Sequence, residues 1–196
     1  MKILTYSFEK FHTLKTNPAY EIGKIILKQF NSKNVDLIQL PVTYDCWEKL
    51  KEKIDEFKPN LVLGIGVAKI NKVKIEKIGL NYKHTESLDN NGNKTIMEKI
   101  DSSKDLAYET DFDILDFVEK LKNKKIPAEV SFNAETYICN YTYFNCLQYL
   151  KNTSIKTVFI HVPISPEEAI ELNTDIPVFP PQLIANEIFN ILSKME

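Results

Sequence analysis

Residues 61–67 read Leu-Val-Leu-Gly-Ile-Gly-Val (LVLGIGV), a nearly continuous apolar run that contains two glycines. A strand with apolar side chains at consecutive positions is buried on both faces, as in sheets that carry helices on either side. The run therefore predicts an interior strand of an α/β sheet.

Segments of strand and helix pattern alternate on both sides of this run. Apolar spacing predicts strands at residues 2–7, 35–40, 73–82, 130–132 and 157–161, and helices after Pro18, after Asp45, at 114–121, from Cys139 to 150 and at 184–192. This alternation indicates an α/β fold with a largely parallel sheet. No linker or repeat divides the chain, so we expect one domain, residues 1–196.

Local signals place two helix starts and one long connection. Asn17-Pro18 predicts an N-cap followed by proline at the first helical position. Asp45, with Glu48 three residues later, predicts a capping box. Residues 83–107 form a polar stretch too long for an ordinary loop, and loops of this length often have a function.

The charge composition excludes several classes of protein. The 25 Lys+Arg residues are all lysine, against 27 Asp+Glu, for a formal net charge of −2. Without arginine there are no guanidinium forks for phosphate or guanine, so no nucleic-acid partner is expected. No apolar run of transmembrane length and no signal peptide is found, so no membrane association is expected. Three unpatterned cysteines favour a reduced, cytoplasmic protein.

Cys139, His161 and Glu76 are the candidate chemical residues. Cys139 lies where a predicted strand and turn lead into a helix, and a helix N-terminus favours a thiolate and an oxyanion. His161 ends a predicted strand, where sites of α/β sheets gather. Glu76 interrupts the alternation of its strand, although a solvent-facing glutamate is the simpler interpretation. Cysteine, histidine and a carboxylate could form a thiol-peptidase triad, but scattered residues of these types are a weak signal.

The sequence contains no complete motif for a cofactor or a metal. Gly64-Ile65-Gly66 lacks the third glycine of a dinucleotide fingerprint, and no phosphate loop occurs. No His/Cys pair has close metal-ligand spacing, so we expect no metal and no cofactor. Cys46 and Cys146 are interpreted as small buried hydrophobic residues.

Five sequence blocks, in order, resemble the pyroglutamyl peptidase I (pyrrolidone-carboxylate peptidase) family. The resemblance extends from near residue 1 to the final helix. The blocks are residues 8–11 followed by Asn17-Pro18, residues 74–78 followed by Asn81, residues 89–93, residues 136–140, and residues 159–163 followed by Pro166-Glu167.

The resemblance implies a fold, an activity and a set of site residues. The fold would be a three-layer α/β/α sandwich around a mostly parallel, mixed and twisted sheet. The activity would be removal of N-terminal pyroglutamate from peptides by a cytosolic cysteine peptidase, commonly a homotetramer, otherwise a dimer. Cys139 would be the nucleophile, His161 the general base and Glu76 the group that orients the imidazole. Phe8, Phe11 and Tyr137 would bind the lactam ring, unless the two phenylalanines are ordinary core residues.

Departures from the family pattern lie around the expected pocket. Residues 66–70 read Gly-Val-Ala-Lys-Ile where the family has Gly-Gln-Ala-Gly-Gly. Glu135 replaces a glycine, so that loop must differ or carry strain. Glu86 replaces an arginine near the oxyanion site, and losing an oxyanion donor costs about 3–4 kcal/mol of barrier.

Two alternatives to the peptidase follow from these residues. One is a catalytically weakened or silent relative that binds a small ligand or a peptide terminus in the inherited pocket. The other is a purine- or nucleotide-binding α/β enzyme, which would need a phosphate site built from backbone or lysine alone.

Overall fold

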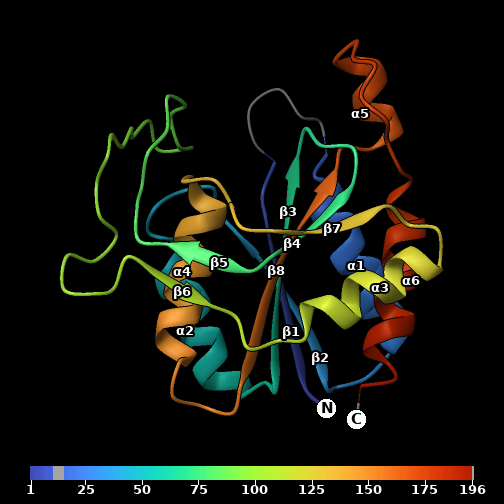
Figure 1. Ribbon diagram of the computed structural model, residues 1–196, viewed down its shortest axis with the longest axis horizontal. Helices are drawn as coiled ribbons and strands as arrows, with labels where there is room; N and C mark the ends of the chain where they lie inside the picture. Colours follow the sequence, from blue (N-terminus) through green and yellow to red (C-terminus); the bar gives the residue numbers. More distant parts are fainter. Residues whose placement is uncertain (11–15, 196) are drawn as a thin grey trace.

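The LVLGIGV run forms the interior strand that its pattern predicts. A computed structural model describes residues 1–10 and 16–195 of the chain. In it β3 (Leu61–Ala68) lies inside a six-stranded sheet (Figure 1). The strand order is β2 (Val35–Leu40), β1 (Ile3–Phe8), β3, β8 (Lys156–Pro163), β4 (Val73–Glu76) and β7 (Ala128–Ser131). β4 is antiparallel to β8, and the other neighbouring pairs are parallel. The sheet is therefore mixed and mostly parallel, as expected.

The elements follow the predicted alternation of strand and helix. The strands are β1 (Ile3–Phe8), β2 (Val35–Leu40), β3, β4 (Val73–Glu76), β5 (Ile78–Leu80), β6 (Ala107–Glu109), β7 (Ala128–Ser131) and β8 (Lys156–Pro163). The helices are α1 (Pro18–Phe30), α2 (Cys46–Phe57), α3 (Ile114–Asn123), α4 (Ile138–Leu150), α5 (Pro166–Glu171) and α6 (Pro181–Leu192).

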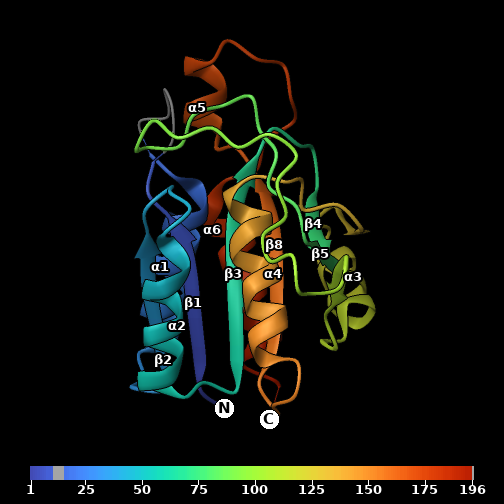
Figure 2. The same ribbon diagram turned by 90° about the vertical axis from the view of Figure 1, so that its left-hand side faces the viewer.

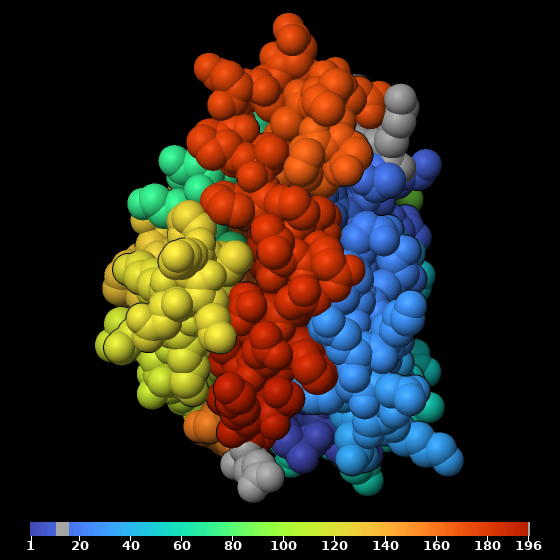
Figure 3. Space-filling model, turned by 90° about the vertical axis from the view of Figure 1, so that its right-hand side faces the viewer, coloured from blue at the N-terminus to red at the C-terminus, as the bar shows by residue number. Residues whose placement is uncertain are grey.

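Helices cover both faces of the sheet and give the molecule three layers. α1, α3 and α6 bury one apolar face, with α6 between the other two (Figure 3). α2 and α4 lie side by side on the opposite face (Figure 2). Burial of β3 on both faces follows from this arrangement, because its alternate side chains enter two different cores. Among the described residues, no helix is both long and apolar enough to cross a bilayer.

One of the two predicted helix caps is confirmed and the other is wrong. The Asn17 side chain accepts a hydrogen bond from the Ala19 N–H at 3.0 Å, and Pro18 begins α1. Asp45 does precede α2, but its side chain makes no capping bond and instead accepts one from the Thr43 hydroxyl. The predicted capping box with Glu48 is therefore absent, because the Asp45 carboxylate is hydrogen-bonded to the hydroxyl of Thr43 instead.

The predicted strand at 73–82 is two strands in two sheets. β4 stays in the central sheet, whereas β5 pairs with β6 in a separate two-stranded ribbon over α4. The chain changes sheet at Lys77, next to Glu76. Glu76 is fully buried, so the interpretation as a solvent-facing residue is wrong.

Two smaller details differ from the sequence pattern. Phe132 lies beyond β7 and is 65% exposed, so it is not part of the strand. α5 was not predicted, although Ser165 and Glu168 form a reciprocal capping box at its start. A Ser-Pro-Glu-Glu sequence carries that signal, since serine and the third following residue are the two capping positions.

Candidate active site

Antiparallel pairing of β4 with β8 brings Glu76 to His161. Glu76 is opposite Phe159 in the register, two residues before His161 on β8. Glu76 Oε1 and His161 Nδ1 are 2.8 Å apart, and their side chains are 0% and 7% exposed. A carboxylate on Nδ1 fixes the orientation of the ring and leaves the other ring nitrogen, Nε2, for proton transfer.

Buried aromatic residues hold this pair in position. The Phe159 ring packs against the His161 ring in an edge-to-face arrangement with centroids 5.0 Å apart. The Tyr143 hydroxyl, on α4, donates a hydrogen bond to the Glu76 backbone carbonyl at 2.8 Å. Tyr143 is fully buried, and the sequence did not single it out. Its place in the apolar stripe of a helix conceals this polar role.

Cys139 approaches the imidazole across a glycine. It is the second residue of α4, and it is partly buried. A Cβ atom built on Gly66 would lie 3.0 Å from Cys139 Sγ and 3.1 Å from His161 Cδ2. Thiol and imidazole therefore both lie next to Gly66, where any side chain would press against them.

His161 has a raised pKa despite its burial. Burial disfavours the charged ring and by itself lowers the pKa, but hydrogen bonding to Cys139, and then to Glu76, outweighs it. The net effect raises the pKa of His161 from 6.5 to about 10. This environment favours an imidazolium beside the thiol.

A pocket of about 340 Å³ opens over Cys139 and His161. Its wall is mainly apolar, with charged residues among the exposed positions. The lining residues are Phe8, Glu9, Asn17, Val42, Val67, Ala68, Lys69, Ala134, Glu135, Tyr137, Ile138, Cys139 and His161. Phe8 and Tyr137 are thus in the pocket, as the resemblance implies, whereas Phe11 lies outside the described residues.

The polar stretch at 83–107 is anchored to one wall of this pocket. The Tyr137 hydroxyl donates to the Leu88 carbonyl at 3.0 Å, and the Asn90 N–H donates to the carbonyl of Val42. The Asn140 amide donates to the carbonyls of Leu80 and Tyr82. The residue after Cys139 therefore fixes the start of α4 to the segment that leads into the loop.

Glu135 and Glu86, the two acidic departures from the family pattern, differ in position. Glu135 lines the pocket with a φ of 61°, so the loop keeps the left-handed conformation expected for glycine and carries the strain. Glu86 is outside the pocket lining, its side chain is 78% exposed, and its carboxylate pairs with Lys94. This contact lowers the pKa of Glu86.

Lys83, a nearby cation, pairs with Glu98 at 3.2 Å and does not line the pocket either. Lys69 is the lysine among the described lining residues.

Cys46 and Cys146 are buried in the core on the α2–α4 side of the sheet. Burial raises the pKa of Cys46 to about 12 and raises that of Cys146 further. Both thiols are thus held in the protonated form, in agreement with their interpretation as hydrophobic residues.

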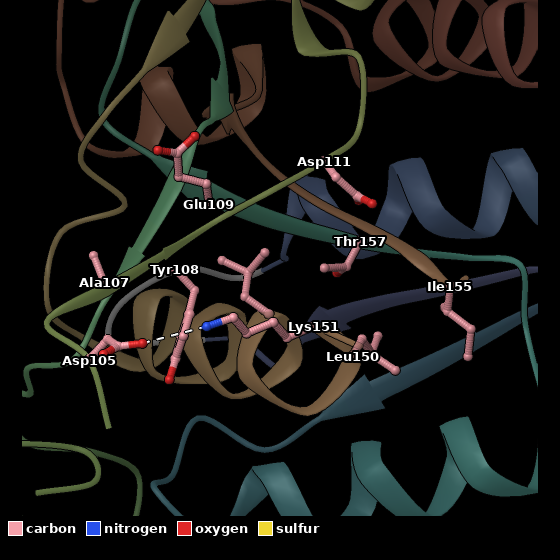
Figure 4. A pocket seen from close by; sticks show the side chains of 10 residues that line it. Asp105, Ala107, Tyr108, Glu109, Asp111, Leu150, Lys151, Ile155 and Thr157 are labelled. Carbon is pink, nitrogen blue, oxygen red and sulfur yellow. Dashed lines mark ion pairs between the residues drawn. The ribbon is translucent and has the colours of Figure 1, made fainter. Parts of the chain in front are cut away.

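A second hollow, of about 370 Å³, lies at the other end of α4 (Figure 4). Tyr108, Leu150 and Ile155 line it together with charged residues. Lys151 points across it to Asp105, 3.5 Å away. No histidine or cysteine contributes to its described lining, so the first pocket has the reactive groups.

The chain is similar in sequence to known peptidases of one family. A family model described as pyroglutamyl peptidase matches residues 1–192. Pyrrolidone-carboxylate peptidase 1 of Caldanaerobacter subterraneus is 35% identical over 175 residues, which cover 87% of this chain and 86% of the relative. The pyrrolidone-carboxylate peptidase of Saccharolobus islandicus is 37% identical over 184 residues, 90% of this chain and 86% of that protein.

Solved structures agree with this relationship. The pyrrolidone carboxyl peptidase of Fervidobacterium islandicum matches with a TM-score of 0.90 and 29% identity, over 100% of this chain and 98% of the other. The enzyme of Thermococcus litoralis matches with a TM-score of 0.88 and 29% identity, over 98% and 91% of the two chains. The similarity thus includes the whole three-layer fold.

Proposed function

Because the chain belongs to the pyroglutamyl peptidase family, we propose that it removes N-terminal pyroglutamate from peptides with Cys139, His161 and Glu76 as its triad. The observation that carries this proposal is the buried Glu76–His161 pair, whose side chains are 2.8 Å apart. Beside it lies Cys139, which is partly buried, whereas the other two cysteines are fully buried. The proposed nucleophile and base thus line one pocket, and the proposed orienting carboxylate is buried behind the histidine.

In the first step, with the thiol proton already transferred to His161, Cys139 Sγ attacks the pyroglutamyl carbonyl carbon. The tetrahedral intermediate then collapses: the C–N bond breaks, His161 returns the proton to the leaving amine, and a pyroglutamyl thioester remains. Glu76 keeps the ring oriented throughout and stabilises its positive charge whenever the ring is protonated.

In the second step, His161 takes a proton from water, and the hydroxide formed attacks the thioester. The C–S bond breaks, the thiol is restored, and pyroglutamic acid leaves. First-turn N–H groups of a helix have no intrahelical partner, and no side-chain cap covers those of α4 in the described structure. These groups are our candidates for the oxyanion donors, a role that does not require the arginine replaced by Glu86.

The apolar wall suits the uncharged ring of pyroglutamate. Phe8 and Ile138 are buried wall residues, and Tyr137 presents part of its ring. A charged N-terminal amine would lose its hydration there, whereas a lactam has no charge to desolvate. We therefore assign the inner pocket to the pyroglutamyl ring. Assembly into dimers or tetramers, a single domain over 1–196 and a cytoplasmic location remain predictions.

The decisive experiment is hydrolysis of pyroglutamyl-β-naphthylamide by the purified protein and its Cys139→Ala variant. We expect thiol-dependent turnover that the variant loses, with Cys46→Ala as the matched control that keeps it. Absence of turnover by a folded wild type would contradict the proposal.

Alkylation separates the peptidase from a silent relative. Iodoacetamide at pH 7 should modify Cys139 far faster than Cys46, whose pKa is raised to about 12 by burial. Equally slow labelling of all three cysteines would favour the silent relative.

A further inference from the structure

The mouth of the catalytic pocket carries three charged side chains. Glu9, Lys69 and Glu135 all line the pocket and are exposed, whereas the wall residues Phe8, Ala134 and Ile138 are buried. The charges thus lie toward solvent, beyond the apolar wall. A substrate whose ring fills the inner pocket must extend its next residue past them.

The two carboxylates dominate this mouth. Within the described part of the chain, none of the ion pairs involves Glu9, Glu135 or Lys69. Among the described lining residues, two negative charges and one positive charge give a net charge of −1. By contrast, the lysines and carboxylates around the second hollow form pairs with one another.

The turn at Glu135 has a fixed backbone conformation. Its φ of 61° lies in the left-handed region, which is strained for a residue other than glycine. Its N–H donates to the Asn133 side chain at 2.9 Å, which holds the turn. The strained conformation places a carboxylate four residues before the cysteine, in the lining of the same pocket.

We propose that Glu9 and Glu135 make this enzyme selective for peptides in which a lysine or arginine follows pyroglutamate, with Lys69 limiting the preference. The inference rests on the proposed function and adds a substrate class to it. The cationic side chain would lie at the mouth between the carboxylates, while the scissile bond lies at Cys139. An acidic residue in the same place would be repelled.

Internal competition measures this preference directly. A mixture of pGlu-Lys-Ala-Ala, pGlu-Gln-Ala-Ala and pGlu-Glu-Ala-Ala amides, digested in one tube and followed by mass spectrometry, gives ratios of kcat/KM. We expect the lysine peptide to exceed the glutamate peptide about fivefold at low salt, because exposed ion pairs are worth up to about 1 kcal/mol each. The ratio should approach one at about 1 M salt.

Charge-neutral variants assign the effect to residues. Glu9→Gln and Glu135→Gln should each lower the lysine-to-glutamate ratio about twofold, and Lys69→Gln should raise it by a similar factor. Glu119→Gln, on the exposed face of α3, is the matched control and should leave the ratio unchanged.

Each other outcome is decisive. A ratio of one, or a preference for the glutamate peptide, would overturn the selectivity while leaving the peptidase intact. Failure to cleave any of the three peptides would overturn the proposed function, and the selectivity with it.

Discussion

The two ends of α4 border hollows of similar size but opposite chemistry. The pocket at its N-terminal end measures about 340 Å³ and contains Cys139 and His161. The hollow at its C-terminal end measures about 370 Å³ and contains Lys151 and Thr157. His161 and Thr157 both belong to β8, so the same helix and strand contribute to both places.

Helix polarity and charge pairing separate these two places. The positive N-terminal end of a helix favours a thiolate, whereas the negative C-terminal end favours a cation, here Lys151 as the residue that caps α4. Around the C-terminal hollow Lys151 pairs with Asp105, and Lys77 pairs with Glu109. Volume alone therefore does not identify the site. The site is the end at which a nucleophile and a base meet.

Removing one residue from each end should test this contrast most strongly. His161→Ala is expected to lower kcat/KM for the naphthylamide substrate by at least about a thousandfold, because it removes the general base. Lys151→Ala should stay within about twofold of wild type, since its ammonium lies at the other hollow. Steady-state kinetics on both variants, with circular dichroism to confirm folding, provides the comparison. Equal losses in the two variants would refute the functional difference between the ends.

Alanine substitutions at two glycines should have different effects, one on the catalytic rate and the other on stability. Gly66→Ala would place a Cβ 2.9 Å from Phe159 Cζ and 3.0 Å from Cys139 Sγ. It should lower kcat about a hundredfold, because the thiol and the ring that packs on His161 must both give way. Gly79→Ala would place a Cβ 2.9 Å from Phe144 Cα, in the middle of α4. Because that neighbour is backbone, the expected result is a loss of about 1–3 kcal/mol of stability.

Urea unfolding and active-site-titrated kinetics distinguish these two outcomes. Unchanged kcat in a folded Gly66→Ala protein would show that the close approach at Gly66 is not needed for reaction.

The pKa of His161 should depend on Cys139, at the N-terminal end of α4, and not on Lys151, at its C-terminal end. Its pKa is raised from 6.5 to about 10, so the imidazolium should persist at pH 8, where an ordinary histidine is neutral. Cys139→Ala removes the leading hydrogen bond that raises the pKa and leaves the opposing burial. The pKa of His161 should then fall by more than one unit, which corresponds to more than about 1.4 kcal/mol of lost preference for the protonated ring. Lys151→Ala should leave it unchanged.

The pKa of His161 can be measured in the wild type, Cys139→Ala and Lys151→Ala by following the imidazole protons with NMR as the pH changes. A wild-type pKa near 6.5 would contradict the coupling of His161 with Cys139 and Glu76.

The sequence predicted the alternation of strands and helices because apolar periodicity records burial. The LVLGIGV run, the Asn17-Pro18 cap and the α6 stripe each depend on residues close in the chain. At Lys77 periodicity gave only a partial signal. The alternation is interrupted at Glu76, but an interruption alone does not show that the chain leaves the sheet, and the partner that draws β5 away, β6, is far along the chain.

The site could be predicted only in part for the same reason. Chemistry and a family resemblance indicated Cys139, His161 and Glu76, but the 2.8 Å contact depends on the register between β4 and β8. Periodicity does not encode that register. Glu135 and the stretch with Lys69 were noted as departures around the pocket, but their gathering with Glu9 at its mouth was not predicted. Glu9 and Lys69 lie about sixty residues apart, with no local pattern in common.

The smallest expected effect is at Thr157, in the C-terminal hollow. Thr157 is 4% exposed, and its hydroxyl has no hydrogen-bond partner among the described residues. Thr157→Val keeps the shape and removes an unsatisfied buried group, so stability should rise by about 1 kcal/mol. Thr110→Val is the matched control and should lower stability by a similar amount, because that hydroxyl donates to the Thr157 carbonyl and accepts from the Phe112 N–H.

Urea unfolding of both threonine variants, together with naphthylamide turnover, completes the comparison of the two ends. If the C-terminal hollow is only structural, both changes alter stability and neither alters kcat/KM. A loss of turnover in folded Thr157→Val protein would instead connect the two ends of α4 through β8, and the separation between them would no longer hold.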